Sequence, residues 1–187
     1  MKKVNTEVEV RFLNIVKEDI IKKLNALNAK DLKEDFIQEV IFYDKELTWS
    51  GENKFIRVRK TNTGITMTYK HQHTNSVDGT TEIELEIDNY ENAKLLLVEG
   101  GLVAFREQEK KRHSFIINDT KIDIDTWPSV PTYVEIEGSS ESELKEVAKS
   151  LSLKWEDAVF ENAKIVIEDK YKIPVSKLRY FTFSKME

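Results

Sequence analysis

Hydrophobic and charged residues alternate along most of this chain. In "TEVEVRFL" (residues 6–13) the hydrophobic residues Val8, Val10 and Phe12 are interleaved with the charged residues Glu7, Glu9 and Arg11. Successive side chains of a β-strand point to opposite faces, so this pattern predicts a strand with one apolar and one charged face. The same reasoning predicts further strands at residues 36–44, 54–60, 64–70, 81–87, 112–118, 121–127 and 132–138.

Three stretches between these strands have apolar residues at helical spacing. They cover about residues 17–29, 89–101 and 139–153, and the first places on one face Ile20, Ile21, Leu24 and Leu27. Gly100 and Gly101 predict the end of the second helix, and serines predict the start of the third. Residues 155–171 are compatible with a short helix before a final strap. Strands and helices in this mixture predict an α+β fold.

The charged faces of the strands allow two arrangements. The apolar faces have to pack against the helices, so the charged faces look away from them. They could face water on an open sheet, or face inward in a sheet that closes on itself. The two signs of charge are segregated, with E-x-E and D-x-D pairs on some strands and "RVR" on another. Paired carboxylates suit an oxygen site for Mg²⁺ or Mn²⁺, and clustered bases suit phosphate.

Composition narrows the class of protein. The chain has 187 residues, 40% hydrophobic and 34% charged, which predicts one domain over residues 1–187, with a core from about 4 to 175 and a C-terminal strap beyond. A net charge of −5 argues against a nucleic-acid partner. The absence of cysteine excludes a zinc–thiolate site and suits a cytoplasmic location. No apolar run approaches the roughly 20 residues that a membrane span needs. A homodimer remains an open alternative.

Several short motifs then occur in an order that resembles a known family. "EVEVR" resembles the E-x-E-x-K signature of the CYTH domain, whose members are also called triphosphate tunnel metalloenzymes. The other motifs follow in the family's order: "RVR" at 57–59, "TYK" ending at Lys70, "TEIE" at 81–84, "KKR" ending at Arg112, and "DTWPSVPTYVEIEG" at 125–138. The resemblance covers about residues 4–140. Each motif alone is common, but the ordered set is specific.

The resemblance implies a closed or nearly closed eight-stranded antiparallel β-barrel, a tunnel with helices packed outside, and a triphosphate bound within it. Carried over by motif, the residues that would bind Mg²⁺ or Mn²⁺ are Glu7, Glu9, Asp125, Glu135 and Glu137. Asp123 is the alternative to Asp125. The residues that would bind the phosphates are Arg57, Arg59, Lys70 and Arg112, with Glu82 and Glu84 as further acids of the inner face. The catalytic candidates are Arg11 and Lys70, although Arg11 stands where the signature has lysine, and an arginine is not a simple replacement for an ammonium group.

The implied function is a divalent-metal-dependent enzyme that acts on a triphosphate. One form resembles class IV adenylate cyclase and converts ATP to cyclic AMP and pyrophosphate; the other hydrolyses inorganic, thiamine or nucleoside triphosphate. The alternative is a non-catalytic module that binds nucleotide or polyphosphate, but binding an anion requires bases and not five acids. His71 and His73 have a spacing that metals use, but no third ligand lies near them in the sequence. Trp49, Trp127 and Trp155 are expected to pack in the core or at a rim.

Overall fold

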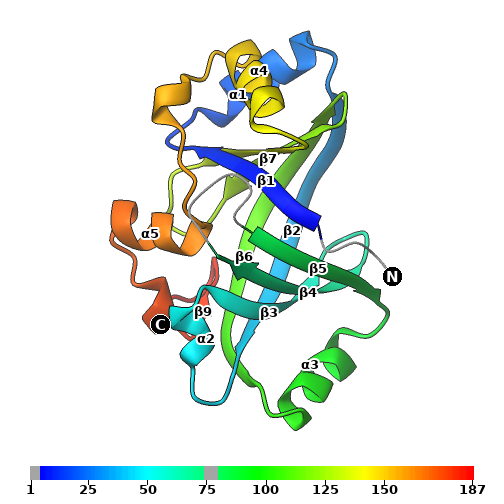
Figure 1. Ribbon diagram of the computed structural model, residues 1–187, viewed down its shortest axis with the longest axis vertical. Coiled ribbons are helices and arrows are strands. Elements are labelled where there is room, and N and C mark those ends of the chain that lie inside the picture. The colour runs from blue at the N-terminus through cyan, green and yellow to red at the C-terminus, as the bar shows by residue number, and fades with distance from the viewer. Residues whose placement is uncertain (1–4, 74–79) are drawn as a thin grey trace.

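Residues 5–73 and 80–187 are described by the computed structural model of the chain, with side chains from Val8 onward in the first of these stretches. Nine strands form one sheet (Figure 1). Their bounds are β1 (Asn5–Phe12), β2 (Lys30–Tyr43), β3 (Lys54–Lys60), β4 (Ile65–Gln72), β5 (Thr80–Ile87), β6 (Val103–Ile117), β7 (Thr120–Thr126), β8 (Tyr133–Gly138) and β9 (Tyr180–Phe181).

Eight antiparallel strands curl into a barrel in the order β2-β3-β4-β5-β1-β8-β7-β6. The two ends of this order meet, because β2 also pairs with β6 from Lys30↔Ile116 to Tyr43↔Val103. The short strand β9 adds to β6 in parallel. The expected α+β fold with a nearly closed barrel is therefore confirmed.

The barrel has a seam where it is open. The pairing of β1 with β5 runs only from Asn5↔Glu82 to Glu7↔Thr80. Beyond that point β1 pairs with β8 along one edge, and along the other edge Arg11 forms an isolated bridge with Val159. The two strands therefore diverge along the rest of their lengths.

Helices cover much of the outer surface of the barrel. Their bounds are α1 (Lys17–Ala26), α2 (Thr48–Gly51), α3 (Tyr90–Glu99), α4 (Glu141–Ser150) and α5 (Ala163–Tyr171), with short 3₁₀ turns η1 (Trp155–Asp157) and η2 (Val175–Lys177). α1 and α4 pack on the outer faces of β1, β7 and β8, where they enclose the largest apolar core. α3 packs on a smaller core that includes Val40, Phe42 and Val58. None of the helices among the described residues is both long and apolar enough to cross a membrane.

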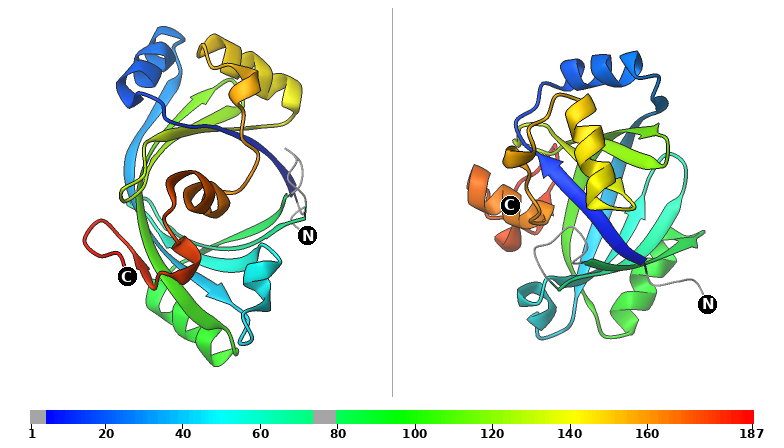
Figure 2. Two further views of the ribbon diagram at one scale, coloured as in Figure 1. Left: turned by 90° about the vertical axis from the view of Figure 1, so that its left-hand side faces the viewer. Right: turned by 45° about the horizontal axis from the view of Figure 1, so that its top comes forward.

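α5 does not lie on the outer surface. Seen from the side shown in Figure 2 (left), the strands curve around α5, which lies across one end of the barrel. Asn162 caps the helix by accepting a hydrogen bond from the backbone N–H of Ile165 at 3.0 Å. Behind α5, the C-terminal segment packs its own core on the barrel end, formed by Trp127, Val130, Tyr133, Ile167, Val175 and Phe181.

Two expectations about the outer surface are wrong in detail. The outer face of β5 is not covered by a helix, because α3 reaches only Ile87, and Ile83 and Leu85 are 44% and 47% exposed. Leu27 lies beyond the end of α1 at Ala26 and is also exposed, whereas Ile20 and Leu24 are buried as expected. The second helix ends as expected, with Gly101 at φ +92° in the left-handed region.

Candidate active site

The inward faces of the strands enclose a cavity of about 250 Å³. Among the residues whose side chains the structure describes, ten basic and six acidic ones line it, in a chain whose net charge is −5. The basic side chains are Arg11, Lys54, Arg57, Arg59, Lys70, Arg106, Lys110, Arg112, Lys121 and Lys164; the acidic ones are Glu9, Glu39, Glu82, Glu84, Glu135 and Glu137. The lining is therefore strongly cationic relative to the chain as a whole.

One wall carries acids that face one another across neighbouring strands. Glu9 on β1 is directly opposite Glu137 on β8, and Arg11 is opposite Glu135. The Arg11 guanidinium lies 2.8 Å from Glu9 Oε1 and 2.6 Å from Glu135 Oε2. Burial disfavours the charge on Arg11, but Glu135 and Glu9 outweigh it and raise the pKa of Arg11 well above its usual value. Arg11 therefore bridges two of the predicted metal ligands.

Arg112 on β6 gathers a second group of acids. Its Nε and Nη2 donate to the two oxygens of Asp125 at 2.6 and 2.7 Å, and it also contacts Asp123 and Glu135. Lys110 Nζ lies 2.8 Å from Asp125 Oδ2. Both candidate aspartates are thus brought to the same guanidinium. Asp125 is fully buried. Lys110 is itself buried, and this burial lowers the pKa of its ammonium group to about 8.

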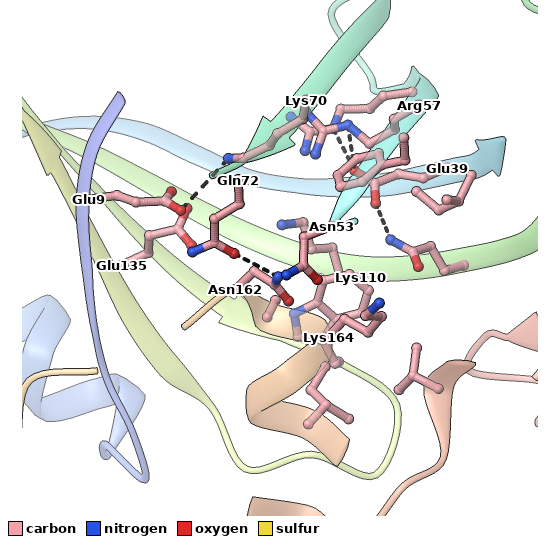
Figure 3. Close-up of a pocket in the computed structure, with 18 of the residues that line it drawn as sticks. Glu9, Glu39, Asn53, Arg57, Lys70, Gln72, Lys110, Glu135, Asn162 and Lys164 are labelled. Carbon is pink, nitrogen blue, oxygen red and sulfur yellow. Dashed lines mark hydrogen bonds and ion pairs between the residues drawn. The ribbon is translucent and has the colours of Figure 1, made fainter. Parts of the chain in front are cut away.

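The opposite wall carries Arg57 and Arg59 on β3, together with an acid that the sequence analysis did not single out. Glu39 on β2 is 2% exposed. Its Oε1 lies 2.6 Å from Arg59 Nε and 3.7 Å from Arg57 Nε, and its Oε2 accepts a hydrogen bond from Gln108 Nε2 at 2.6 Å (Figure 3). Burial alone would raise the pKa of Glu39, but Arg59 and Arg57 outweigh it and lower the pKa below its usual value. Arg57 Nε is buried with no hydrogen-bond partner among the described residues.

Lys70 on β4 connects the two walls. Its Nζ lies 3.7 Å from Glu9 Oε1 and 3.3 Å from Glu82 Oε2. Glu84 accepts a hydrogen bond from Thr68 Oγ1 at 2.9 Å. The structure therefore brings Glu82 and Glu84 to the cavity beside the predicted phosphate-binding lysine. Glu7 is placed only by its backbone in β1, because its side chain lies outside the described part of the structure.

Other lining residues were not singled out from the sequence, although one of them, Lys110, is the first residue of the "KKR" motif. Arg106, Gln108 and Lys110 lie on the first half of β6, which was not expected to be a strand. From α5, the cap residue Asn162 donates to Gln72 Oε1 at 2.8 Å (Figure 3). Both faces of this part of β6 carry polar residues, buried in the cavity on the inner face and exposed on the outer face, so the sequence shows no apolar alternation there.

The fit of a divalent metal can be judged from the acid wall. Glu9 and Glu137 are directly opposite each other on neighbouring strands. Like charges in such a position are destabilising, and a cation bound by both would offset this. Carboxylate oxygens are the ligands that Mg²⁺ and Mn²⁺ prefer. In the part of the chain that is described, no three acidic or histidine side chains form a ready metal cage. The donors have the chemistry that such an ion prefers, and in this structure two of them, Glu9 and Glu135, are paired with Arg11.

The histidine pair and the tryptophans lie apart from these walls or are packed. The rings of His71 and His73 are 3.9 Å apart, and His73 Nε2 lies 3.0 Å from Thr81 Oγ1. Trp127 is 6% exposed and stacks on Phe181 with ring centroids 5.6 Å apart. The expectation of core packing is confirmed for Trp127.

The buried ion pair of Glu39 predicts a specific loss of stability in acid. Because its pKa is lowered by folding, the stabilisation is present above the unfolded pKa of about 4.3 and is lost as the pH falls below it. We expect the free energy of unfolding of the wild type to fall by about 1–2 kcal/mol more than that of Glu39→Gln between pH 7 and pH 3. Denaturant titration at the two pH values measures this difference. Glu107→Gln, at an exposed site on β6, should lose as much as the wild type, and an equal loss in all three would contradict the ion pair.

Comparisons with known proteins agree with this architecture. The chain is 25% identical to the PH1012 protein of Pyrococcus horikoshii OT3, with a TM-score of 0.71, over 83% of this chain and 96% of that one. It is also 25% identical to a conserved hypothetical protein of Pyrococcus furiosus, with a TM-score of 0.70, over 84% and 97% of the two chains. HpAC1 from Hippeastrum, described with a dominant triphosphatase activity, is 14% identical with a TM-score of 0.61, over 89% and 95%. The comparison with curated proteins found no match.

The family model that matches is that of the CYTH domain, over residues 5–166. This span runs from the first residues of β1 into α5 and includes every strand of the eight-stranded barrel. The resemblance drawn from the motifs is thereby confirmed. The chain belongs to the CYTH domain family.

Proposed function

We propose that this protein is a divalent-metal-dependent triphosphatase, which cleaves the terminal phosphate from a triphosphate held in the barrel. The observation that carries the proposal is the cationic lining: ten bases around a cavity of about 250 Å³ in an acidic chain. The six acids of the same lining leave an excess of bases, and a triphosphate supplies several negative charges in a small volume.

The bases have the geometry to bind phosphate oxygens. Arg57 and Arg59 project from one strand face, with Arg57 Nε left without a hydrogen-bond partner among the described residues. Glu39 Oε1 accepts a hydrogen bond from Arg59 Nε at 2.6 Å, so the two terminal nitrogens of that guanidinium can donate hydrogen bonds to a phosphate. With Lys70 and Arg112, these side chains would bind the phosphate chain and stabilise the charge that develops on it during the reaction.

The acid wall would hold the metal. Glu9, Glu135 and Glu137 are the main ligands in this proposal, with Glu7 and Asp125 as further members. When bound, Mg²⁺ or Mn²⁺ supplies Lewis-acid chemistry at the phosphorus. Arg11 and Lys70 contact these acids directly, at 2.6–3.7 Å, so their positive charges would lie beside a phosphate chain bound at the acid wall. We therefore assign to Arg11 and Lys70 the catalytic positions next to the reacting phosphate.

The cyclase reaction needs the same metal and bases, but also needs a site that fixes the ribose and base of ATP. Product analysis separates the reactions. The protein is incubated with tripolyphosphate, ATP and thiamine triphosphate, in Mg²⁺ and in Mn²⁺. Release of orthophosphate supports the proposal; cyclic AMP with pyrophosphate as the main products contradicts it in favour of a cyclase, and no product with any substrate favours a binding module.

A further inference from the structure

A row of polar side chains crosses the inner faces of three neighbouring strands. We infer that Glu39 and Gln108, in the middle of this row, are positioning residues, which hold the Arg59 guanidinium in the orientation that binds a phosphate chain. Neither residue belongs to the motifs from which the phosphate-binding residues were assigned. The inference rests on the proposed function, because it takes Arg59 as a residue that binds phosphate.

The pairing of the strands puts this row in register. Glu39 on β2 is directly opposite Arg59 on β3 along one edge and directly opposite Gln108 on β6 along the other. Arg106 precedes Gln108 by two residues on β6, so its side chain points to the same inner face. All four side chains line the cavity, and Glu39, Arg106 and Gln108 are buried.

Hydrogen bonds connect the four side chains from one end of the row to the other. Arg59 Nε and Gln108 Nε2 each donate to Glu39, to Oε1 and Oε2 respectively, both at 2.6 Å. Gln108 Oε1 accepts from Arg106 Nε at 2.8 Å. Arg106 is held in turn, because its Nη1 donates to the backbone oxygen of Val175 at 3.1 Å. The carboxylate that contacts Arg59 is therefore fixed through both of its oxygens.

The order of acid and amide in this row is specific. An N–H donor lies at each end, Arg59 Nε and Arg106 Nε, and a carboxylate can only accept hydrogen bonds. One carboxylate next to one amide satisfies both ends and the contact between them. Two amides, or two carboxylates, would place like groups against each other. The row thus orients the Arg59 guanidinium before any phosphate is bound.

Glu39 has two opposite effects on the binding of an anion. Its negative charge repels the anion, and because Glu39 is 2% exposed, water screens this charge little. Its hydrogen bond with Arg59 removes freedom of the guanidinium that binding would otherwise have to remove. The loss of Glu39 therefore strengthens binding if its charge dominates and weakens binding if its positioning role dominates.

The test measures the Kd of tripolyphosphate with Mg²⁺ for the intact protein by isothermal titration calorimetry. Glu39→Gln removes the charge and puts a second amide against Gln108, and we expect its Kd to rise about tenfold, the size of one lost charge-assisted hydrogen bond. Glu39→Gln combined with Gln108→Glu restores one acid beside one amide. The double variant should return to within about threefold of the wild type. Thermal unfolding shows that each variant is folded.

The outer faces of the same two strands provide a matched control. Gln38 on β2 is directly opposite Glu109 on β6, and its Nε2 donates to Glu109 Oε1 at 3.4 Å. This pair has the same two residue types as the inner pair but does not line the cavity. Glu109→Gln removes the same charge from the chain and should leave the Kd unchanged.

The outcomes separate this inference from the proposed function. An unchanged or lower Kd in Glu39→Gln overturns the inference, and so does a double variant that binds no better than Glu39→Gln. A wild type that binds tripolyphosphate without cleaving it overturns the proposed function and leaves the inference standing. A wild type that does not bind tripolyphosphate overturns both.

A measurement on the wild type decides the matter if the variants of Glu39 do not fold. In an arginine-selective ¹⁵N NMR spectrum, the Nε–H signal of Arg59 is identified by its absence from Arg59→Lys. We expect this N–H to be protected from hydrogen exchange before tripolyphosphate is added, because Glu39 already accepts its hydrogen bond. Protection that arises only after tripolyphosphate is added would overturn the inference.

Discussion

Replacing Glu9 by glutamine is expected to lower the turnover of triphosphate more than about hundredfold while the fold survives. Loss of a residue that only supports a metal ligand reduces activity about 10–100-fold, and the loss of a ligand charge should exceed that. Glutamine keeps the size of Glu9 and can still accept the hydrogen bond that Arg11 Nη2 donates at 2.8 Å. Steady-state rates across a Mg²⁺ titration, together with a melting curve, measure the effect.

Glu107→Gln makes the same chemical change at an exposed position of β6 and should leave turnover and metal dependence unaltered. Because Glu137 lies directly opposite Glu9, Glu137→Gln should resemble Glu9→Gln. Turnover within about threefold of the wild type in both variants would exclude the acid wall as the metal site.

The largest effect on stability should come from Arg112. Its guanidinium contacts Asp123, Asp125 and Glu135 in an almost fully buried cluster. Removing one partner of a buried ion pair costs about 3–5 kcal/mol, because the remaining charges are left uncompensated. We expect Arg112→Met to lower the Tm by roughly 6–20 °C, given about 2–4 °C per kcal/mol for a chain of this size.

Lys121→Met is the matched control for this variant. Lys121 Nζ also contacts Asp123, at 2.8 Å, but the lysine side chain is 40% exposed. A surface ion pair contributes at most about 1 kcal/mol, so its Tm should change by no more than a few degrees. If thermal unfolding showed equal shifts in the two variants, the buried acid cluster could not be stabilised by Arg112 as described.

Local alternation was sufficient to predict the strands that separate an apolar from a charged face. "KFIRVRK" was expected to be a strand over residues 54–60, and β3 spans Lys54–Lys60. Its apolar face packs outward under α3, and its charged face turns into the tunnel. Because the two faces differ in character, their alternation is visible in the sequence.

The first half of β6 shows why other parts of the site were missed. Its inward residues include Arg106 and Lys110, which are polar because they line the tunnel, and its outward residues include Glu107, which is polar because it is exposed. Because both faces carry polar residues, the sequence shows no alternation of apolar and polar positions in this stretch. On β2 the alternation is lost for another reason, because both faces carry apolar residues after Glu39. The next inward residue, Ile41, is as apolar as Val40 on the outer face.

The contribution of α5 could not be read from the sequence for a different reason. Its two buried residues, Val166 and Ile167, are adjacent, so they do not form a helical stripe. Only the packing of the helix across the barrel end brings Ile167 and Asn162 to the tunnel. Long-range placement of this kind leaves no local pattern.

The central claim is that the charges face inward to hold a triphosphate, and a thermal shift titration tests it most directly. Tripolyphosphate with Mg²⁺ binds only the folded state in this account, so a hundredfold excess over Kd should stabilise it by about 2.7 kcal/mol, or a Tm rise of roughly 5–10 °C. Orthophosphate at matched ionic strength should raise the Tm far less. Equal shifts that follow only the salt concentration and ignore the length of the phosphate chain would contradict the tunnel as a triphosphate site.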